Sequence, residues 1–148
     1  MAVTSDRAQA ASAAISVGDE LLLYATRGAF HNPRRDRGRI FGRAHATTPV
    51  EELMAPVALL DREFTSGFAF ELDALAPPHQ GVNLAELIRR LSTFPNKKGW
   101  AMRLRRPLVT LTPEDAHLLR KRLLAEVGET ADLIRRYVSE SRSSVPAG

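Results

Sequence analysis

Apolar residues in the middle of the chain fall into short runs of strand length, and this spacing limits the fold more than any other feature. The continuous run LLLYA predicts a strand that is buried on both faces, and two longer segments alternate as half-buried strands do. Strands are predicted at Leu21–Ala25, 39–47, 64–78, 100–106 and 108–111. They favour an α+β fold, a small mixed barrel of about five to six strands flanked by short helices.

The alternation also assigns side chains to the two faces of each strand. In residues 39–47 one face is apolar and small, and the other is basic and aromatic. The first face holds Ile40, Gly42, Ala44 and Ala46, and the second holds Arg39, Phe41, Arg43 and His45. In residues 64–78 the side chains predicted to point inward are Phe68, Phe70 and Leu72, and those predicted to point outward are Glu71 and Asp73. Pro77 and Pro78 end this strand.

Two helices are predicted from their caps and from apolar residues at helical spacing. Asn83 caps the first, whose apolar side chains are Leu84, Leu87, Ile88 and Leu91. In the segment TLTPEDAHLL, Thr112 is the N-cap, Pro113 takes the first helical position and Asp115 can close a capping box. The buried stripe of this helix, which ends near Gly128, comprises Ala116, Leu119, Leu123, Leu124 and Val127.

The remaining segments are predicted from composition and helix-breaking residues. Residues 5–15 are alanine-rich and favour a short helix, whereas 48–56 contain two prolines and predict a loop or one helical turn. A last helix at 129–140 has one apolar side, made by Leu133, Ile134, Tyr137 and Val138. We therefore expect a single domain at 1–128, followed by a short C-terminal helix and polar tail at 129–148.

Composition excludes several classes of protein. The chain has no cysteine, which rules out disulfides, thiolate zinc sites and a cysteine nucleophile. It has no stretch of about 20 apolar residues that could span a membrane, and its first residues lack the pattern of a secretory signal. A cytoplasmic protein that does not enter membranes is expected.

The net charge of +4 is concentrated in one loop, RGAFHNPRRDRGR at residues 27–39. This loop carries five arginines against one acid, and the rest of the chain has equal numbers of basic and acidic residues. Arginine binds phosphate and carboxylate through a planar fork and also stacks on aromatic rings. The loop is therefore a candidate anion-binding segment, although a solvated loop without a ligand has the same composition.

The sequence contains none of the common catalytic or nucleotide-binding motifs. We find no GxSxG, GxxxxGK[ST], GxGxxG or HExxH pattern. The histidines, at least 14 residues apart, are not spaced as metal ligands, and adjacent acids do not define an acid and base pair. We expect no catalytic residue, no metal and no cofactor, and hence a protein that is not an enzyme.

The order of several motifs resembles the EVE domain of the PUA-like superfamily, which is related in fold to the YTH and ASCH domains. The resemblance covers roughly residues 16–124. It rests on VGDELLLY, then on RIFGRAHAT, and later on a leucine-rich helix and the segments WAMRLR and LTPED. The matching residues are Gly18, Asp19, Tyr24, Gly42, Ala44, Leu84–Leu91, Phe94, Trp100, Arg105 and Thr112–Asp115. The longer basic loop at 27–39 departs from the family pattern.

The resemblance implies that the chain binds DNA or RNA and reads a modified or flipped base in an aromatic pocket. From the chemistry of the side chains, the candidate base-pocket residues are Tyr24, Phe30, His31, Asn32, Phe94 and Trp100. The candidate phosphate-binding residues are Arg27, Arg34, Arg35, Arg37, Arg39, Lys97, Lys98, Arg103 and Arg105.

Two alternative functions stay open at this point. The arginine-rich loop is also suited to docking an acidic partner protein, in which case binding need not depend on base modification. A small ASCH-like hydrolase would need a lysine in the pocket, and only Lys97 or Lys98 is well placed for that role in the sequence.

Overall fold

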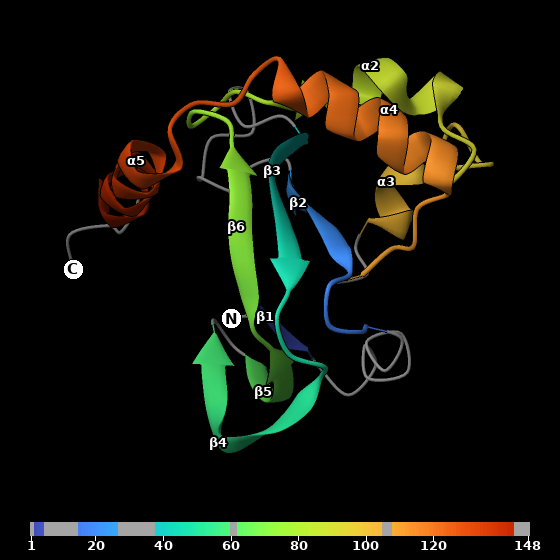
Figure 1. Ribbon diagram of the computed structural model, residues 1–148. Coiled ribbons are helices and arrows are strands. Elements are labelled where there is room, and N and C mark those ends of the chain that lie inside the picture. The colour runs from blue at the N-terminus through green and yellow to red at the C-terminus, as the bar shows by residue number, and fades with distance from the viewer. Residues whose placement is uncertain (1, 5–14, 27–37, 60–61, 105–107, 144–148) are drawn as a thin grey trace.

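A computed structural model of the chain describes residues 2–4, 15–26, 38–59, 62–104 and 108–143 (Figure 1). Within these residues the protein is an α+β structure with two antiparallel sheets and several helices. Helices cover one end of the larger sheet, the smaller sheet lies at its other end, and a C-terminal helix stands beside the larger sheet (Figure 1). The predicted helix at 5–15 lies almost entirely outside the described residues. No helix among the described residues is long and apolar enough to span a bilayer.

The larger sheet confirms two of the predicted strands. It has the order β2-β3-β6, with β2 at Glu20–Ala25, β3 at Arg39–Ala46 and β6 at Phe70–Leu75, and the short β7 at Val82–Asn83 also pairs with β3. The alternation predicted for β3 is confirmed, because every second residue from Ile40 to Ala46 is buried. By contrast, the expectation that β2 is buried on both faces is wrong, since Leu21–Ala25 is only half-buried.

The smaller sheet contains a strand where the sequence predicts a loop. Its order is β1-β5-β4, with β1 at Ala2–Thr4, β5 at Arg62–Phe68 and β4 at Glu51–Leu59. Pro56 is accommodated because β4 is an edge strand whose pairing with β5 is irregular between Glu52 and Val57. A proline lacks the N–H that a central strand would need, but an edge strand with a bulge tolerates it. The prediction of a loop or helical turn at 48–56 is therefore wrong.

The predicted strand at 64–78 is divided between the two sheets. Ala69 separates β5 from β6, and both its backbone N–H and its carbonyl oxygen form hydrogen bonds with the turn after β3. The Ala69 carbonyl oxygen accepts a hydrogen bond of 2.9 Å from the Thr47 N–H, and the Ala69 N–H donates one of 2.9 Å to Thr48 Oγ1. Phe68 is buried as predicted, whereas Phe70 and Leu72 are only half-buried. The described strands thus form two sheets joined at this corner, and no closed barrel is found among them.

The helical layer has two predicted helices and one that was predicted as a strand. It comprises α2 at Leu84–Leu87, the 3-10 helix η1 at Ile88–Arg90, α3 at Trp100–Arg103 and α4 at Pro113–Leu124. Asn83 caps α2 through a 3.2 Å hydrogen bond from the Ala85 N–H to its side-chain oxygen, as expected.

Residues 100–111 do not form the two predicted strands. Trp100 and Leu104 pack against the core, whereas Met102 between them is 66% exposed. The residues that face the core are therefore four apart, which is the spacing of a helix and not of a strand. The segment 108–111 is described but has no strand partner among the described residues. Both strand predictions in this segment are therefore wrong.

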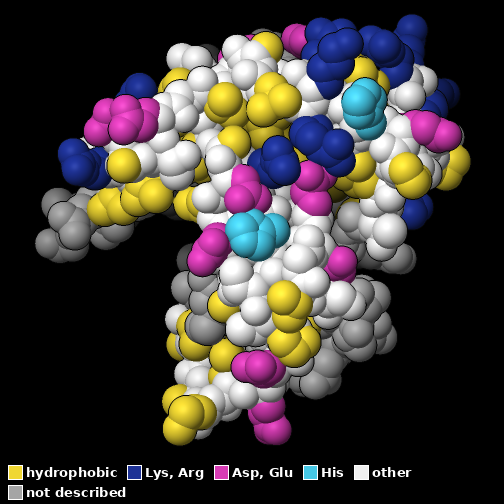
Figure 2. All heavy atoms as spheres, in the orientation of Figure 1, with side chains coloured by type: hydrophobic (Ala, Val, Ile, Leu, Met, Phe, Trp, Pro, Cys, Tyr) yellow, Lys and Arg dark blue, Asp and Glu magenta, His cyan; other side chains and the backbone are white. Residues whose placement is uncertain are grey.

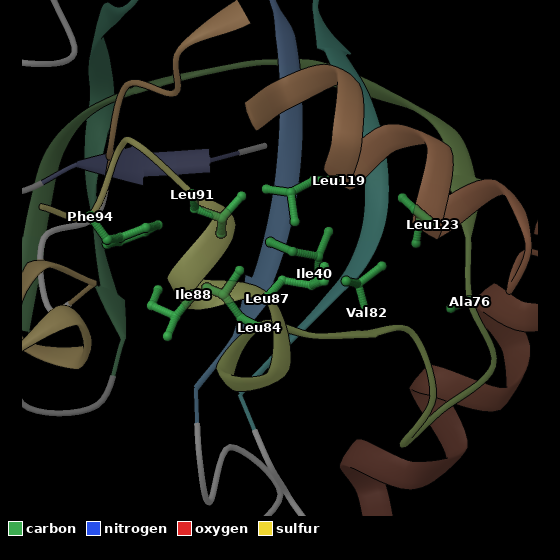
Figure 3. Packing of buried hydrophobic residues seen from close by; sticks show 10 residues of the cluster. All are labelled: Ile40, Ala76, Val82, Leu84, Leu87, Ile88, Leu91, Phe94, Leu119 and Leu123. Atoms are coloured by element: carbon green, nitrogen blue, oxygen red, sulfur yellow. The ribbon is translucent and has the colours of Figure 1, made fainter. Parts of the chain in front are cut away.

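The main core lies between the larger sheet and the helical layer (Figure 3). Ile40 and Val82 come from the sheet, and leucines from α2 and α4 pack on them together with Ile88 from η1. Its buried members are Ile40, Ala76, Val82, Leu84, Leu87, Ile88, Leu91, Phe94, Leu119 and Leu123. In α4 the predicted stripe is correct for Leu119 and Leu123 but wrong for Leu124, which is 55% exposed because the helix turns it to solvent.

The C-terminal helix α5, at Thr130–Ser143, packs on the larger sheet through one edge of its predicted apolar side. Leu133 is buried, and the Tyr137 hydroxyl donates a 2.8 Å hydrogen bond to the Ala76 carbonyl oxygen. Burial raises the pKa of Tyr137 to about 12, opposed by the nearby charge of Arg136. Ile134, which was predicted on the same side as Leu133, is exposed.

A buried carboxylate joins α4 to the loop that follows η1. The side chain of Asp115 is 3% exposed and accepts hydrogen bonds from the N–H groups of Ser92, at 3.1 Å, and of Thr93, at 2.7 Å. The Thr93 hydroxyl also donates to it. The predicted N-cap is present, because Thr112 Oγ1 accepts a 3.3 Å hydrogen bond from the Asp115 N–H. The Asp115 carboxylate reaches across to the loop, while the Thr112 N–H donates to Thr93 Oγ1 at 3.2 Å.

We predict that Asp115→Asn lowers the free energy of unfolding by about 2 kcal/mol, because donors on two backbone positions lose a charged acceptor. Burial alone would raise the pKa of Asp115, but hydrogen bonds from Thr93, Ser92 and Thr112 outweigh it and lower the pKa below 3.8. This stabilisation is present above the unfolded-state pKa and is lost as the pH falls towards the folded-state pKa. Urea denaturation of the wild type and the variant from pH 7 to pH 2.5 measures both the loss of stability and its dependence on pH. If Asp115→Asn lost as much stability on acidification as the wild type does, the role assigned to the Asp115 carboxylate would be wrong.

Candidate functional site

Trp100, the only tryptophan in the chain, begins α3 and is half-buried. The ring of Phe94 meets it nearly edge-on, with centroids 6.4 Å apart and planes at 83°. Phe94 is only 1% exposed and belongs to the core. The structure thus brings together these two predicted pocket residues, but it places Phe94 beneath the surface as a support, while Trp100 retains exposed area.

The turn before Trp100 is fixed by a side chain in the same loop. The Asn96 side-chain oxygen accepts hydrogen bonds from the N–H groups of Lys98, at 3.2 Å, and of Gly99, at 3.0 Å. Such a turn closes the backbone locally and sets the direction in which the following helix starts. Two contacts therefore hold Trp100 in place: the turn closed by the Asn96 side chain and the edge-on contact with the Phe94 ring.

The two adjacent lysines of this loop have different environments. Lys97 Nζ donates to the carbonyl oxygens of Ile88, at 3.1 Å, and of Leu91, at 2.6 Å, where η1 ends. A cation at the C-terminus of a helix satisfies carbonyls that lack partners within the helix. Lys98 is exposed and has no ion pair with a described residue. Of the two predicted phosphate-binding lysines, Lys97 is thus engaged in the fold, and Lys98 is available.

We predict that Lys97→Ala lowers the free energy of unfolding by about 1 to 2 kcal/mol, because two carbonyl oxygens lose a charged donor. The matched variant Lys98→Ala removes the same charge from the same loop and should stay within about 0.5 kcal/mol of the wild type. Thermal and urea denaturation of the two variants provide the comparison. Equal stabilities would show that the contacts of Lys97 contribute nothing.

Tyr24 lies at the end of β2, half-buried against the core cluster. Its hydroxyl lies over Gly38, where a Cβ atom would be only 2.1 Å from the Tyr24 oxygen, so a residue with a side chain would displace the ring. Burial raises the pKa of the Tyr24 phenol. Arg39, which follows Gly38, is half-buried and donates a weak 3.4 Å hydrogen bond to the Gly81 carbonyl oxygen. These two predicted site residues therefore lie where the chain enters and leaves the segment 27–37.

Most of the arginine-rich loop falls outside the described residues. The predicted site residues in that category are Arg27, Phe30, His31, Asn32, Arg34, Arg35 and Arg37, and Arg105 is a further one. Their roles remain sequence predictions. Arg103 is described and lies exposed at the end of α3.

Two side chains of the basic face predicted for β3, Arg43 and His45, lie beside acids from neighbouring elements. Glu20 on β2 accepts hydrogen bonds from Arg120 on α4, the shortest 2.8 Å, and its carboxylate is also 3.0 Å from Arg43 Nε. His45 Nδ1 lies 2.9 Å from the carboxylate of Asp73 on β6. These contacts tie α4 to the sheet and engage Arg43, whereas Arg39 on the same face has no ion pair with a described residue.

Exposed cations without an ion pair to any described residue occur instead on the helical layer. They are Arg89, Arg90, Lys98, Arg103, Lys121 and Arg122. Figure 2 shows Lys and Arg side chains gathered over α2 at the top of the molecule. The sequence analysis missed four of these residues, although the apolar spacing of the two helices already placed them on the solvent-facing sides.

Comparison with known proteins assigns no family. No protein-family model matches the sequence, and no curated protein matches it. Among the described residues, no three histidine, aspartate or glutamate side chains are grouped so that they could hold a metal ion.

Proposed function

We propose that this chain binds nucleic acid without catalysing a reaction, as its resemblance to the EVE domain implies, and that its two sheets belong to a PUA-like barrel. A modified or flipped base stacks on Trp100, and neighbouring cations hold the phosphates. The observation that carries the proposal is the environment of Trp100. Its ring is half-buried, supported edge-on by Phe94, and flanked in the chain by the exposed cations Lys98 and Arg103.

The combination of a fixed ring and free cations supports nucleic acid over other ligands. A ring that is already held needs little ordering when a base stacks on it, so less of the stacking energy is lost. Unpaired arginine and lysine side chains around it attract the phosphates of a nucleic acid, and this attraction weakens as the salt concentration rises. The loop at 27–39 is proposed to contribute the remaining phosphate contacts, with Asn32 or His31 at the edge of the base.

The geometry of Lys97 weakens the alternative of an ASCH-like hydrolase. A reactive lysine must present a free amine to its substrate, whereas Lys97 donates to two carbonyl oxygens. Only Lys98 is then left in this loop, and its side chain is exposed. Docking of an acidic protein is the other alternative, and base-dependent binding separates it from the proposal.

We predict that Trp100→Ala weakens binding to short DNA and RNA oligonucleotides by about 5- to 160-fold, because one stacked base is worth about 1 to 3 kcal/mol. Trp100→Phe should retain part of the affinity. Met102→Ala is the matched control, since it truncates an exposed apolar side chain on the same helix α3.

Fluorescence anisotropy with labelled oligonucleotides, with and without base modifications and at low and high salt, measures these effects. The emission of Trp100 in the wild type should also be quenched when a base stacks on its ring. Because Trp100 is the only tryptophan, this signal reports on that site alone. Uniform failure to bind any DNA or RNA would overturn the proposed function. Tight binding that Trp100→Ala leaves unchanged would overturn the stacking role.

A further inference from the structure

The outer side of the helical layer carries a second group of cations, separate from those beside Trp100. We define the helical basic surface as Arg89 and Arg90 on η1 together with Lys121 and Arg122 on α4. All four side chains are exposed, and none forms an ion pair with a described residue. Neither acid of α4 forms an ion pair with these cations: Asp115 is buried in the contact with the loop, and Glu114 has no ion pair with a described residue. Glu86 on the neighbouring α2 accepts a 3.2 Å hydrogen bond from the Asn83 side chain.

The orientation of α4 separates this surface from the paired charges on the sheet. Arg120 binds Glu20 on the face of the sheet. Residues two apart in an α-helix point about 200° away from each other, so Arg122 lies on the opposite flank from Arg120. Leu119 and Leu123 bury the side between them in the core. One helix therefore uses one cation to dock on the sheet and presents the next two to solvent.

The same helix begins beside the loop that precedes Trp100 and carries these cations about two turns further along its axis. Its first turn is held beside Phe94 by the hydrogen bonds from Ser92 and Thr93 to Asp115. Figure 1 shows α4 starting near α3 and running across the end of the larger sheet. Arg122 follows Asp115 by seven residues, about 10 Å along the axis at 1.5 Å per residue.

We propose that the ligand is a nucleic-acid strand of several nucleotides, in which phosphates beyond the base at Trp100 contact the helical basic surface. This inference rests on the proposed function and specifies its ligand class: an oligonucleotide and not a free nucleotide. The surface adds phosphate contacts, and with them affinity and salt dependence, but it does not distinguish one base from another.

The test compares the wild type with the double variant Lys121→Ala/Arg122→Ala, using fluorescein-labelled oligo(dT) of two, four and eight nucleotides. Wild-type affinity should rise at least 10-fold from two to eight nucleotides. The double variant should lose most of that rise and should bind the dinucleotide as the wild type does. For the eight-nucleotide probe, the slope of log affinity against log salt concentration should become shallower by an amount that corresponds to one or two lost phosphate contacts. Both positions are exposed, so the fold is unaffected, which circular dichroism and thermal melting verify.

The matched control is Arg135→Ala/Arg136→Ala, which removes the same charge from exposed positions on α5. This control should keep the wild-type dependence on length, which separates a local contact from a change in net charge. If both double variants behave alike, or if poly-glutamate binds as tightly as the eight-nucleotide probe, the inference is wrong. If Trp100→Ala weakens binding and Lys121→Ala/Arg122→Ala does not, the inference fails and the proposed function stands. If the wild type binds none of the three probes, the inference fails, and if it also binds none of the DNA and RNA oligonucleotides with modified bases, the proposed function fails too.

Discussion

The hydrogen bonds to the Asp115 carboxylate are the contact on which the arrangement of the helical layer depends. They join the first turn of α4 to Ser92 and Thr93, and Phe94 follows immediately. Phe94 in turn supports Trp100 from below. A single ionised side chain thus fixes the helix that carries the outer cations and the loop that carries the aromatic pair. Any change that protonates or removes this carboxylate should disturb both parts together, because Asp115 is the most buried polar or charged residue among those described and it joins the two parts directly.

Electrostatics divides the described surface into a paired part and an unpaired part. On the larger sheet, Glu20 and Asp73 are matched with Arg43, Arg120 and His45. On the helical layer, exposed cations have no such partners. Surface ion pairs contribute little to stability on their own, so the pairing on the sheet serves mainly to orient α4. The cations left over are those that a phosphate ligand can neutralise without first breaking an existing contact.

The sequence predicted those helices and strands whose positions depend on residues close together in the chain. Asn83 and Thr112 were identified as helix caps because capping depends on residues within one turn, and the alternation in 39–47 predicted the buried face of β3. The strand at Glu51–Leu59 could not be predicted, since its proline is tolerated only because the strand lies at an edge. Likewise, the helix at Trp100 depends on a distant core that holds Trp100 and Leu104, which the apparent alternation concealed.

The candidate site shows the same limit. The sequence identified Trp100 and Lys98 as candidate site residues, but it could not distinguish Lys97 from Lys98, because what separates them is the end of η1 several residues away. It also could not separate a ring with exposed area from the buried ring that supports it, and Phe94 is the buried one. A buried edge-on support restricts the motion of Trp100 before any base arrives, so truncating Phe94 should weaken stacking without removing a ligand contact, and should do so in proportion to the freedom that Trp100 gains.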